Sequence, residues 1–279
     1  MGELAVNHDG VTLAGERVGE GIPVVLAHGL TATRRYVVMR SRALERSGHD
    51  VVTYDARGHG QSDPAPSPGE YDYVNLTADL AAVLDELELE RAVLAGSSMG
   101  AHTALRLALD EPQRVIALAL ITPGYDPATV DDPERLVQWD ALSEGLRAGG
   151  VEGFMAAYEH YAPSGRWRDT VLQAVRQRMA LHEHPEAVAD ALRVVPRARP
   201  FARWDELGAI EAPVVVVASH DEADPEHPYA VAERYASAIP NARLVSEEPG
   251  ESPLAWQGGR LSKVLAELTS TAARERRMS

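Results

Sequence analysis

The chain contains no cysteine, and only 5% of its 279 residues are aromatic. Without cysteine there is no disulfide, no thiolate nucleophile and no cysteine metal ligand, which fits a reducing compartment. The longest apolar runs, residues 115–121 and 214–218, are far too short to cross a bilayer. The N-terminus also lacks the basic segment and apolar run of a signal peptide. We therefore expect a cytoplasmic protein with no membrane partner.

Positive charge is scarce as well, with 27 Lys and Arg against 42 Asp and Glu and a net charge of −15. A phosphate backbone is bound by a basic face, so this balance argues against a nucleic-acid partner. The hydrophobic content of 45% and the chain length suffice for a sizeable core without covalent staples. These features leave an enzyme or a binding protein for a small molecule, with a homodimer as the default oligomeric expectation.

Short apolar runs alternate with longer amphipathic ones over most of the chain. Residues 4–6 and 11–17 flank Asp9-Gly10, a two-residue turn signal, and predict a hairpin. Continuous β-branched runs alternating with helical spacing predict a mostly parallel sheet covered by helices on both faces. The expected strands are 23–27, 50–54, 91–95, 115–121, 212–219 and 242–246; the expected helices are 33–46, 76–89, 101–109, 229–239 and 261–275.

Residues 127–203 interrupt this alternation, because only helical spacing occurs there. The expected helices are 136–146, 154–161, 170–181 and 185–194. We interpret this stretch as a helical cap inserted into a core formed by residues 1–126 and 204–279. Its aromatic residues are candidates either for a pocket wall or for packing between helices; they are Trp139, Phe154, Tyr158, Tyr161 and Trp167.

Gly96-Ser97-Ser98-Met99-Gly100 lies between an expected buried strand and an expected helix. G-x-S-x-G in that context is typical of a nucleophile elbow, a strained turn that exposes the serine oxygen. The flanking glycines fit a backbone that tolerates no bulk. Ser98 is therefore the candidate nucleophile, and the start of the following helix favours negative charge beside it.

Two further motifs follow strands. His28-Gly29 ends the first buried strand, and the backbone N–H of Leu30 could form an oxyanion hole with that of Met99. We expect His28 to hold its loop by hydrogen bonds rather than to transfer protons. Asp55, Arg57 and His59, after the next strand, are expected to organise loops.

The motifs AHG (27–29), DARGHGQSD (55–63) and GSSMG (96–100), in this order, resemble the α/β-hydrolase fold, especially its esterase and lactonase members. The resemblance implies a mostly parallel sheet with a helical cap, Ser98 as nucleophile, and no metal or organic cofactor. It also implies an acid in the loop after the strand that follows the cap. Counting from the strand end favours Asp221 or Glu222, whereas counting back from Pro228 favours Asp224, which we prefer.

The family's base is a histidine just after the last strand, but residues 246–256 contain none, and His227 is the last histidine in the chain. A serine hydroxyl is a weak nucleophile without an adjacent base. The candidate replacements are His227, then His182 and His184, then Glu251 with a pKa raised by burial. Ser252 is expected where the imidazole normally lies.

The sequence thus predicts a cofactor-independent serine hydrolase for a small carboxylic ester, lactone or thioester. Its predicted site is Ser98, Asp224 and His227, with Leu30 and Met99 as the oxyanion hole and no metal. The alternative is a non-hydrolytic, ligand-binding protein that has kept the elbow and lost the base.

Overall fold

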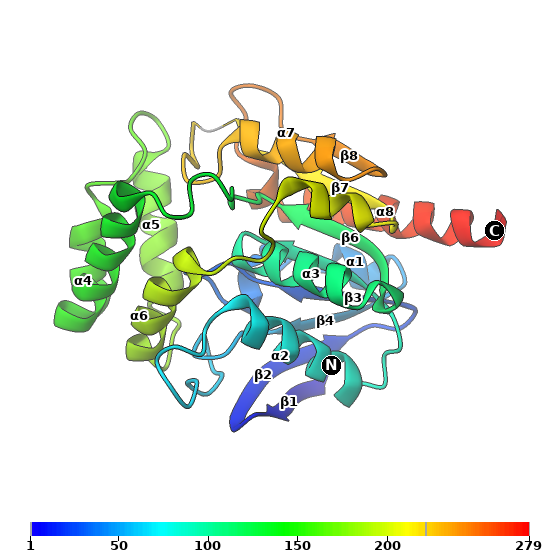
Figure 1. Cartoon of the computed structure of the whole chain (residues 1–279), viewed down its shortest axis with the longest axis horizontal. Helices are drawn as coiled ribbons and strands as arrows, with labels where there is room; N and C mark the ends of the chain where they lie inside the picture. The colour runs from blue at the N-terminus through cyan, green and yellow to red at the C-terminus, as the bar shows by residue number, and fades with distance from the viewer. Residues whose placement is uncertain (1, 221, 279) are drawn as a thin grey trace.

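A computed structural model describes residues 2–220 and 222–278, with side chains up to residue 274. Eight strands form one sheet in the order β1-β2-β4-β3-β5-β6-β7-β8, and every neighbouring pair from β4 to β8 is parallel (Figure 1). The strands are β1 (Gly2–His8), β2 (Val11–Val18), β3 (Ile22–Ala27), β4 (His49–Tyr54), β5 (Ala92–Ser97), β6 (Val115–Ile121), β7 (Val214–Val217) and β8 (Ala242–Val245). The predicted α/β-hydrolase architecture is present.

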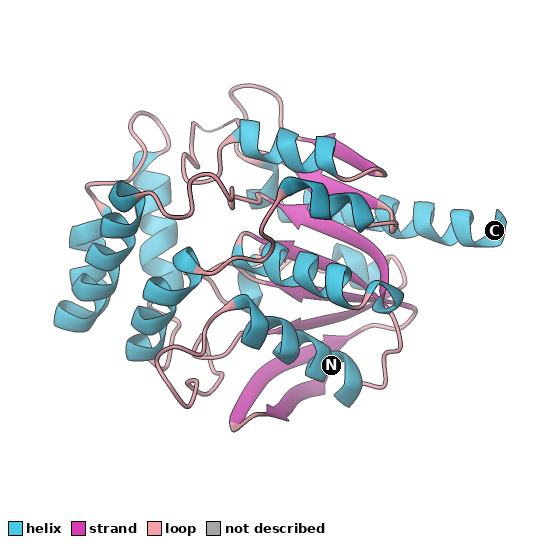
Figure 2. Cartoon of the chain, viewed as in Figure 1, coloured by secondary structure: helices cyan, strands magenta, loops and turns pink. Residues whose placement is uncertain are grey.

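Helices cover both faces of the sheet (Figure 2). One apolar cluster joins the sheet to α2 (Tyr73–Glu86), α3 (Met99–Asp110) and α7 (Tyr229–Ala238). A second joins the opposite face to α1 (Ala43–Arg46) and α8 (Gly258–Met278). The central strands are therefore buried on both sides, which explains their unbroken apolar sequence.

The hairpin predicted at the N-terminus forms between β1 and β2. Asp9 and Gly10 both have positive φ, of 45° and 77°. A two-residue turn whose twist matches that of the two strands requires positive φ at both positions, and the Asp-Gly pair adopts this conformation at little cost.

Helices α4 (Pro133–Tyr158), α5 (Arg168–Met179) and α6 (Pro185–Val194) lie together beyond the end of the sheet toward which the arrowheads of the parallel strands point (Figure 1). A third apolar cluster packs these helices against residues that follow the strands, including Leu30 and Met99. The chain leaves the sheet after β6 and returns before β7, so this helical layer covers the carboxyl ends of the strands. Ligand sites of open α/β sheets lie at those ends.

One local prediction was wrong. Residues 33–46 do not form one helix; a single 3₁₀ turn (Arg34–Tyr36) and the short α1 are separated by Met39 and Arg40, both with positive φ. The carbonyl of Val38 packs so closely on the start of α8 that a Cβ at Gly258 would lie 2.2 Å from it. Tertiary packing therefore overrides the helical spacing here.

The two helices predicted at 136–146 and 154–161 are present as the two parts of α4, which meet at a kink. Gly149 and Gly150 break its helical geometry, and Gly150 has a positive φ of 58°. Glycine adopts this conformation readily, so the chain changes direction between the two helices within two residues.

Candidate active site

Ser98 occupies a strained turn between β5 and α3, with φ 50° and ψ −112°. The two glycines of the motif permit this turn. A Cβ at Gly96 would lie 2.1 Å from the carbonyl carbon of Gly100, and a Cβ at Gly100 would lie 2.2 Å from the carbonyl oxygen of Ala27. The motif therefore needs glycine at both positions for packing, and the half-buried Ser98 hydroxyl faces a cavity.

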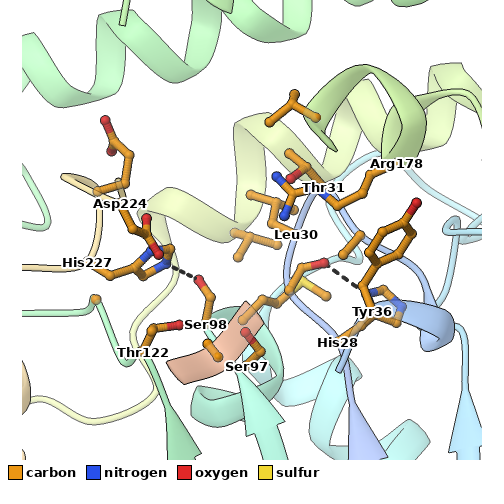
Figure 3. Close-up of a pocket in the computed structure, with 18 of the residues that line it drawn as sticks. His28, Leu30, Thr31, Tyr36, Ser97, Ser98, Thr122, Arg178, Asp224 and His227 are labelled. Atoms are coloured by element: carbon orange, nitrogen blue, oxygen red, sulfur yellow. Dashed lines mark hydrogen bonds and ion pairs between the residues drawn. The ribbon is translucent and has the colours of Figure 1, made fainter. Parts of the chain in front are cut away.

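His227 and Asp224 come from one loop between β7 and α7, three residues apart. His227 Nε2 lies 2.8 Å from Ser98 Oγ, and His227 Nδ1 lies 2.7 Å from Asp224 Oδ1 (Figure 3). The carboxylate accepts a hydrogen bond from Nδ1–H, which leaves Nε2 as an acceptor facing the serine hydroxyl. Three predicted site residues therefore lie together in the structure, although Ser98 and His227 are 129 positions apart in the sequence.

Each member of the His227–Asp224 pair shifts the pKa of the other. Burial lowers the pKa of His227, but the charge of Asp224, its hydrogen bond and the charge of Glu226 outweigh burial and raise this pKa above its usual 6.5. Burial raises the pKa of Asp224, yet His227 and the more distant Arg178 lower it below its usual value. The carboxylate is therefore ionised at neutral pH and stabilises a protonated imidazole.

The backbone amides of Leu30 and Met99 border the cavity that Ser98 faces. Within the described residues, neither amide donates a hydrogen bond to a protein atom. The loop after β3 lies against the elbow, because a Cβ at Gly29 would lie 3.5 Å from Ser98 Cβ. Both donors are therefore free to bind an oxygen beside Ser98.

His28 holds this loop in place, as the sequence predicts. Its Nδ1 lies 2.8 Å from the carbonyl of Gly29, and its Nε2 accepts from the amide of Ala56 at 2.9 Å. Burial and the charges of His59 and Arg34 outweigh the Gly29 hydrogen bond and lower the pKa of His28 to about 3. A permanently neutral ring with both nitrogens engaged is a structural element.

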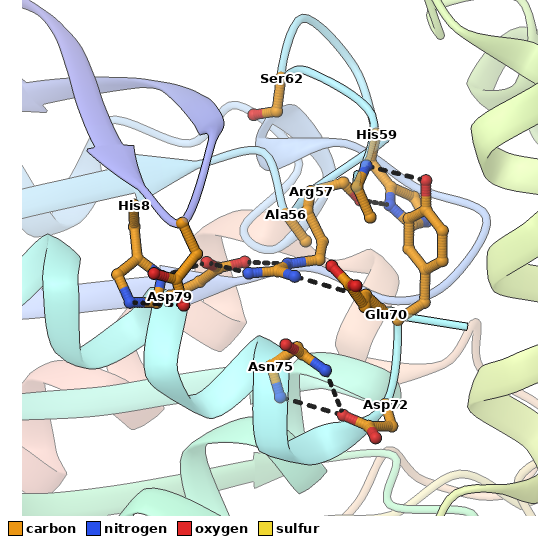
Figure 4. A network of polar contacts seen from close by, with 12 residues as sticks. His8, Ala56, Arg57, His59, Ser62, Glu70, Asp72, Asn75 and Asp79 are labelled. Carbon is orange, nitrogen blue, oxygen red and sulfur yellow. Dashed lines mark hydrogen bonds and ion pairs between the residues drawn. The ribbon is translucent and has the colours of Figure 1, made fainter. Parts of the chain in front are cut away.

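The loop after β4 is likewise fixed by buried polar contacts (Figure 4). Arg57 donates two 2.7 Å hydrogen bonds to Asp79, a bidentate ion pair with almost no exposed surface. His59 lies 2.7 Å from the carbonyl of Leu30 through Nε2, and Asp55 accepts from the backbone of Arg34 at 2.7 Å. These residues organise loops around the Leu30 amide, in agreement with the sequence.

The cavity in front of Ser98 has a volume of about 180 Å³. Its walls come from the loops after β3, β5, β6 and β7 and from the helices above them. All five aromatic residues of the inserted segment pack in the third apolar cluster. Trp139, Phe154 and Tyr158 also line this cavity, whereas Tyr161 and Trp167 do not border it.

The other candidate bases lie elsewhere. His182 is buried, accepts from the Gly60 amide at 2.9 Å and stacks edge-on against His59. His184 is the N-cap residue of α6. Glu251 is exposed and its hydrogen bond from Arg260 lowers its pKa, opposite to the shift a carboxylate base requires. None of these residues lines the cavity around Ser98 within the described part of the chain.

The loop after β8, where the resemblance places a histidine, is held by the buried carboxylate of Glu247. It accepts from the amides of His220 at 2.8 Å and Leu254 at 3.0 Å. Ser252 does not border the cavity formed by the described residues. Asp221, the alternative acid, lies outside the described residues. Among the side chains that the structure describes, no three of His, Asp or Glu cluster so as to hold a metal ion, and no described helix is long and apolar enough to span a membrane.

Two residues of the site escaped the sequence analysis. Gly124, after β6, packs against the His227 ring, and a Cβ there would lie 2.9 Å from His227 Cδ2. Arg178, on α5, enters the cavity (Figure 3). Neither belongs to a motif, so only contacts between distant segments reveal them.

The model of the α/β-hydrolase-fold family matches residues 22–258, and the chain belongs to this family. It is 31% identical to a 2-hydroxy-6-oxononadienedioate/2-hydroxy-6-oxononatrienedioate hydrolase of Cupriavidus pinatubonensis, over 72% of this chain and 69% of that protein. It is 28% identical to 3-oxoadipate enol-lactonase 1 of Acinetobacter baylyi, over 80% and 79%. The solved structure of an enzyme that degrades N-acyl homoserine lactones superposes with a TM-score of 0.75 at 27% identity, covering 96% of this chain and 99% of that one. The protein is thus a hydrolase of the α/β family.

Proposed function

We propose that the protein is a cofactor-independent serine hydrolase that acts on a small carboxylic ester, lactone or thioester. The observation that carries this proposal is the 2.8 Å contact between His227 Nε2 and Ser98 Oγ, with Asp224 on the other ring nitrogen. Relatives named as a lactonase and as a lactone-degrading enzyme support the acyl substrate class.

In the proposed reaction, Ser98 Oγ attacks the carbonyl carbon while its proton passes to His227 Nε2. The carbonyl oxygen becomes an oxyanion and accepts hydrogen bonds from the amides of Leu30 and Met99, each worth about 3 kcal/mol in the transition state. His227 then gives its proton to the leaving oxygen or sulfur, and an acyl-Ser98 ester remains. A water molecule then gives a proton to His227 and attacks the carbonyl carbon of this ester. The acid is released, and His227 returns the proton to Ser98 Oγ.

In this scheme the base reaches Ser98 from the loop after β7 instead of the loop after β8. Asp224 and His227 then belong to a single segment, and Asp224 both orients the ring and stabilises its protonated form. The helices of residues 127–203 act as the cap that closes the cavity above Ser98.

The test combines labelling and kinetics. After treatment with a fluorophosphonate, the intact mass of the wild type should increase by one adduct and that of Ser98→Ala should not change, because only an activated serine reacts. With p-nitrophenyl acetate, His227→Ala should lower kcat/KM by about 10³-fold or more through loss of the base. His184→Ala, which removes a histidine outside the cavity, is the matched control and should retain wild-type turnover.

An unlabelled wild type without esterase activity would contradict this proposal and favour a non-hydrolytic binding protein. Turnover that survives His227→Ala would assign proton transfer to another group.

A further inference from the structure

Arg178 is the charged cavity residue without a partner in the described structure. The other charged groups at the cavity are engaged: Asp224 with His227, Glu226 with the Gln138 amide at 2.8 Å, and Arg135 with the Pro196 carbonyl at 3.0 Å. The Arg178 guanidinium makes no hydrogen bond or ion pair with a described residue, and its Nε is buried without an acceptor.

A guanidinium in this position is energetically costly. Burial lowers the pKa of Arg178, and the partial compensation comes only from charges at a distance, on Tyr158, Asp224 and Tyr36. The Arg178 side chain could instead have extended to solvent, as does that of Arg176 two residues earlier, which pairs with Glu152 on the surface. A half-buried cation whose buried Nε has no acceptor is complementary to an anion that enters the cavity.

Building on the proposed function, we infer that the substrate carries a carboxylate and that Arg178 binds it. The guanidinium presents paired N–H donors that match the two oxygens of a carboxylate. A dianionic or bulky group such as a phosphate ester fits less well, because Glu226 and Asp224 also border this cavity of about 180 Å³.

The position of Arg178 assigns this carboxylate to the acyl part of the substrate. In Figure 3, Arg178 reaches the cavity beside Thr31 and Leu30, across Ser98 from His227. His227 must face the leaving group in order to protonate it. The acyl chain then extends toward the opposite side, so the preferred substrate is a monoester of a dicarboxylic acid or a lactone that carries a second, free carboxylate on its acyl part.

The experiment compares two aryl esters of equal acyl chain length, mono-p-nitrophenyl adipate and p-nitrophenyl hexanoate. The wild type should prefer the adipate monoester, and Arg178→Gln should lower the ratio of the two kcat/KM values by about 10- to 100-fold. Both esters are measured on the same variant at the same pH, so an indirect effect of Arg178 on His227 acts on both kcat/KM values and cancels in the ratio. Arg178→Lys keeps the charge but loses the paired N–H donors of the guanidinium, so its ratio should lie between those of the wild type and Arg178→Gln.

Arg176→Gln is the matched control, since it removes a guanidinium from the same helix on the solvent side and should leave the ratio unchanged. In a second pair of esters, 4-acetoxybenzoate carries the carboxylate on its leaving group, and phenyl acetate is its uncharged counterpart. A loss confined to 4-acetoxybenzoate in Arg178→Gln would overturn the acyl-side assignment.

Binding is measured independently of catalysis in the Ser98→Ala background. Monomethyl adipate should bind, and adding Arg178→Gln should raise its Kd by about 10- to 100-fold in calorimetry. If Ser98-dependent hydrolysis occurs but neither the ratio nor the Kd depends on Arg178, the inference is wrong and the proposed hydrolase stands. If monomethyl adipate binds through Arg178 while no ester is hydrolysed, the inference stands and the proposed hydrolase fails.

Discussion

Gly124 provides a sharp test of the catalytic geometry, because it touches the His227 ring without taking part in any proton transfer. A Cβ at this position would lie 2.9 Å from His227 Cδ2, 3.1 Å from the Glu226 carbonyl and 3.6 Å from His227 Nε2. Carbon atoms pack at about 3.5 Å or more, so Gly124→Ala must displace the ring by about 0.6 Å. The backbone at Gly124 does not have positive φ, and alanine therefore adds no backbone strain.

A displacement of this size degrades the 2.8 Å contact between His227 and Ser98. Misplacing a catalytic group by about 1 Å costs on the order of 100-fold, so we expect kcat/KM for p-nitrophenyl acetate to fall about 10- to 100-fold. Fluorophosphonate labelling of Ser98 should slow by a similar factor, because it depends on the same base. Both are measured beside the thermal midpoint, which reports whether the variant is folded.

Gly208→Ala is the matched control, since a Cβ there meets no atom within 4 Å. It should keep the wild-type kcat/KM. A folded Gly124→Ala enzyme with unchanged turnover would refute the assignment of His227 as the base, because a base in hydrogen-bond contact cannot tolerate this shift.

The remaining predictions concern pH and buried charge. The proposed reaction requires neutral His227, whose pKa is raised, so kcat/KM should fall as the pH drops through a midpoint above 6.5. Asp224→Asn should lower that midpoint, and a midpoint that does not depend on Asp224 would contradict the pairing of the two residues. Asp79→Asn leaves the Arg57 guanidinium buried without its counter-charge and should cost about 3–5 kcal/mol in urea unfolding; a loss under 1 kcal/mol would show that water reaches the pair. Burial, with the charges of His227 and Arg135, lowers the pKa of His102 to about 3, so its contribution to the unfolding free energy is full above pH 6.5 and decreases by about 2 kcal/mol between pH 6.5 and 5. His102→Phe should weaken this pH dependence by that amount, and an equal dependence in both proteins would disprove it.

Local patterns in the sequence were sufficient for most of the architecture. The central strands are buried on both faces, so their apolar runs are unbroken and easily recognised. The G-x-S-x-G motif predicted the position of Ser98 because two glycines and a strand–helix boundary are local requirements of the turn. The Asp-Gly turn was readable for the same reason.

Sequence reasoning failed where contacts between distant segments outweigh local preference. Residues 33–46 have helical spacing, yet the close approach of Val38 to Gly258 imposes a turn with positive φ at Met39. Glu251 is near the expected place of the missing base, but an ion pair with Arg260 holds it at the surface.

The sequence by itself determined the sheet, the elbow and the short list of groups able to replace the absent histidine. Only the tertiary structure places one of them, His227, in contact with Ser98, because this 2.8 Å contact depends on how the ends of β5 and β7 are placed across the sheet. The same holds for Arg178, one of several arginines in the inserted helices. Its sequence context gives no sign that its guanidinium enters the cavity while that of Arg176 turns to solvent, since helix packing, rather than composition, sets the face that each residue occupies.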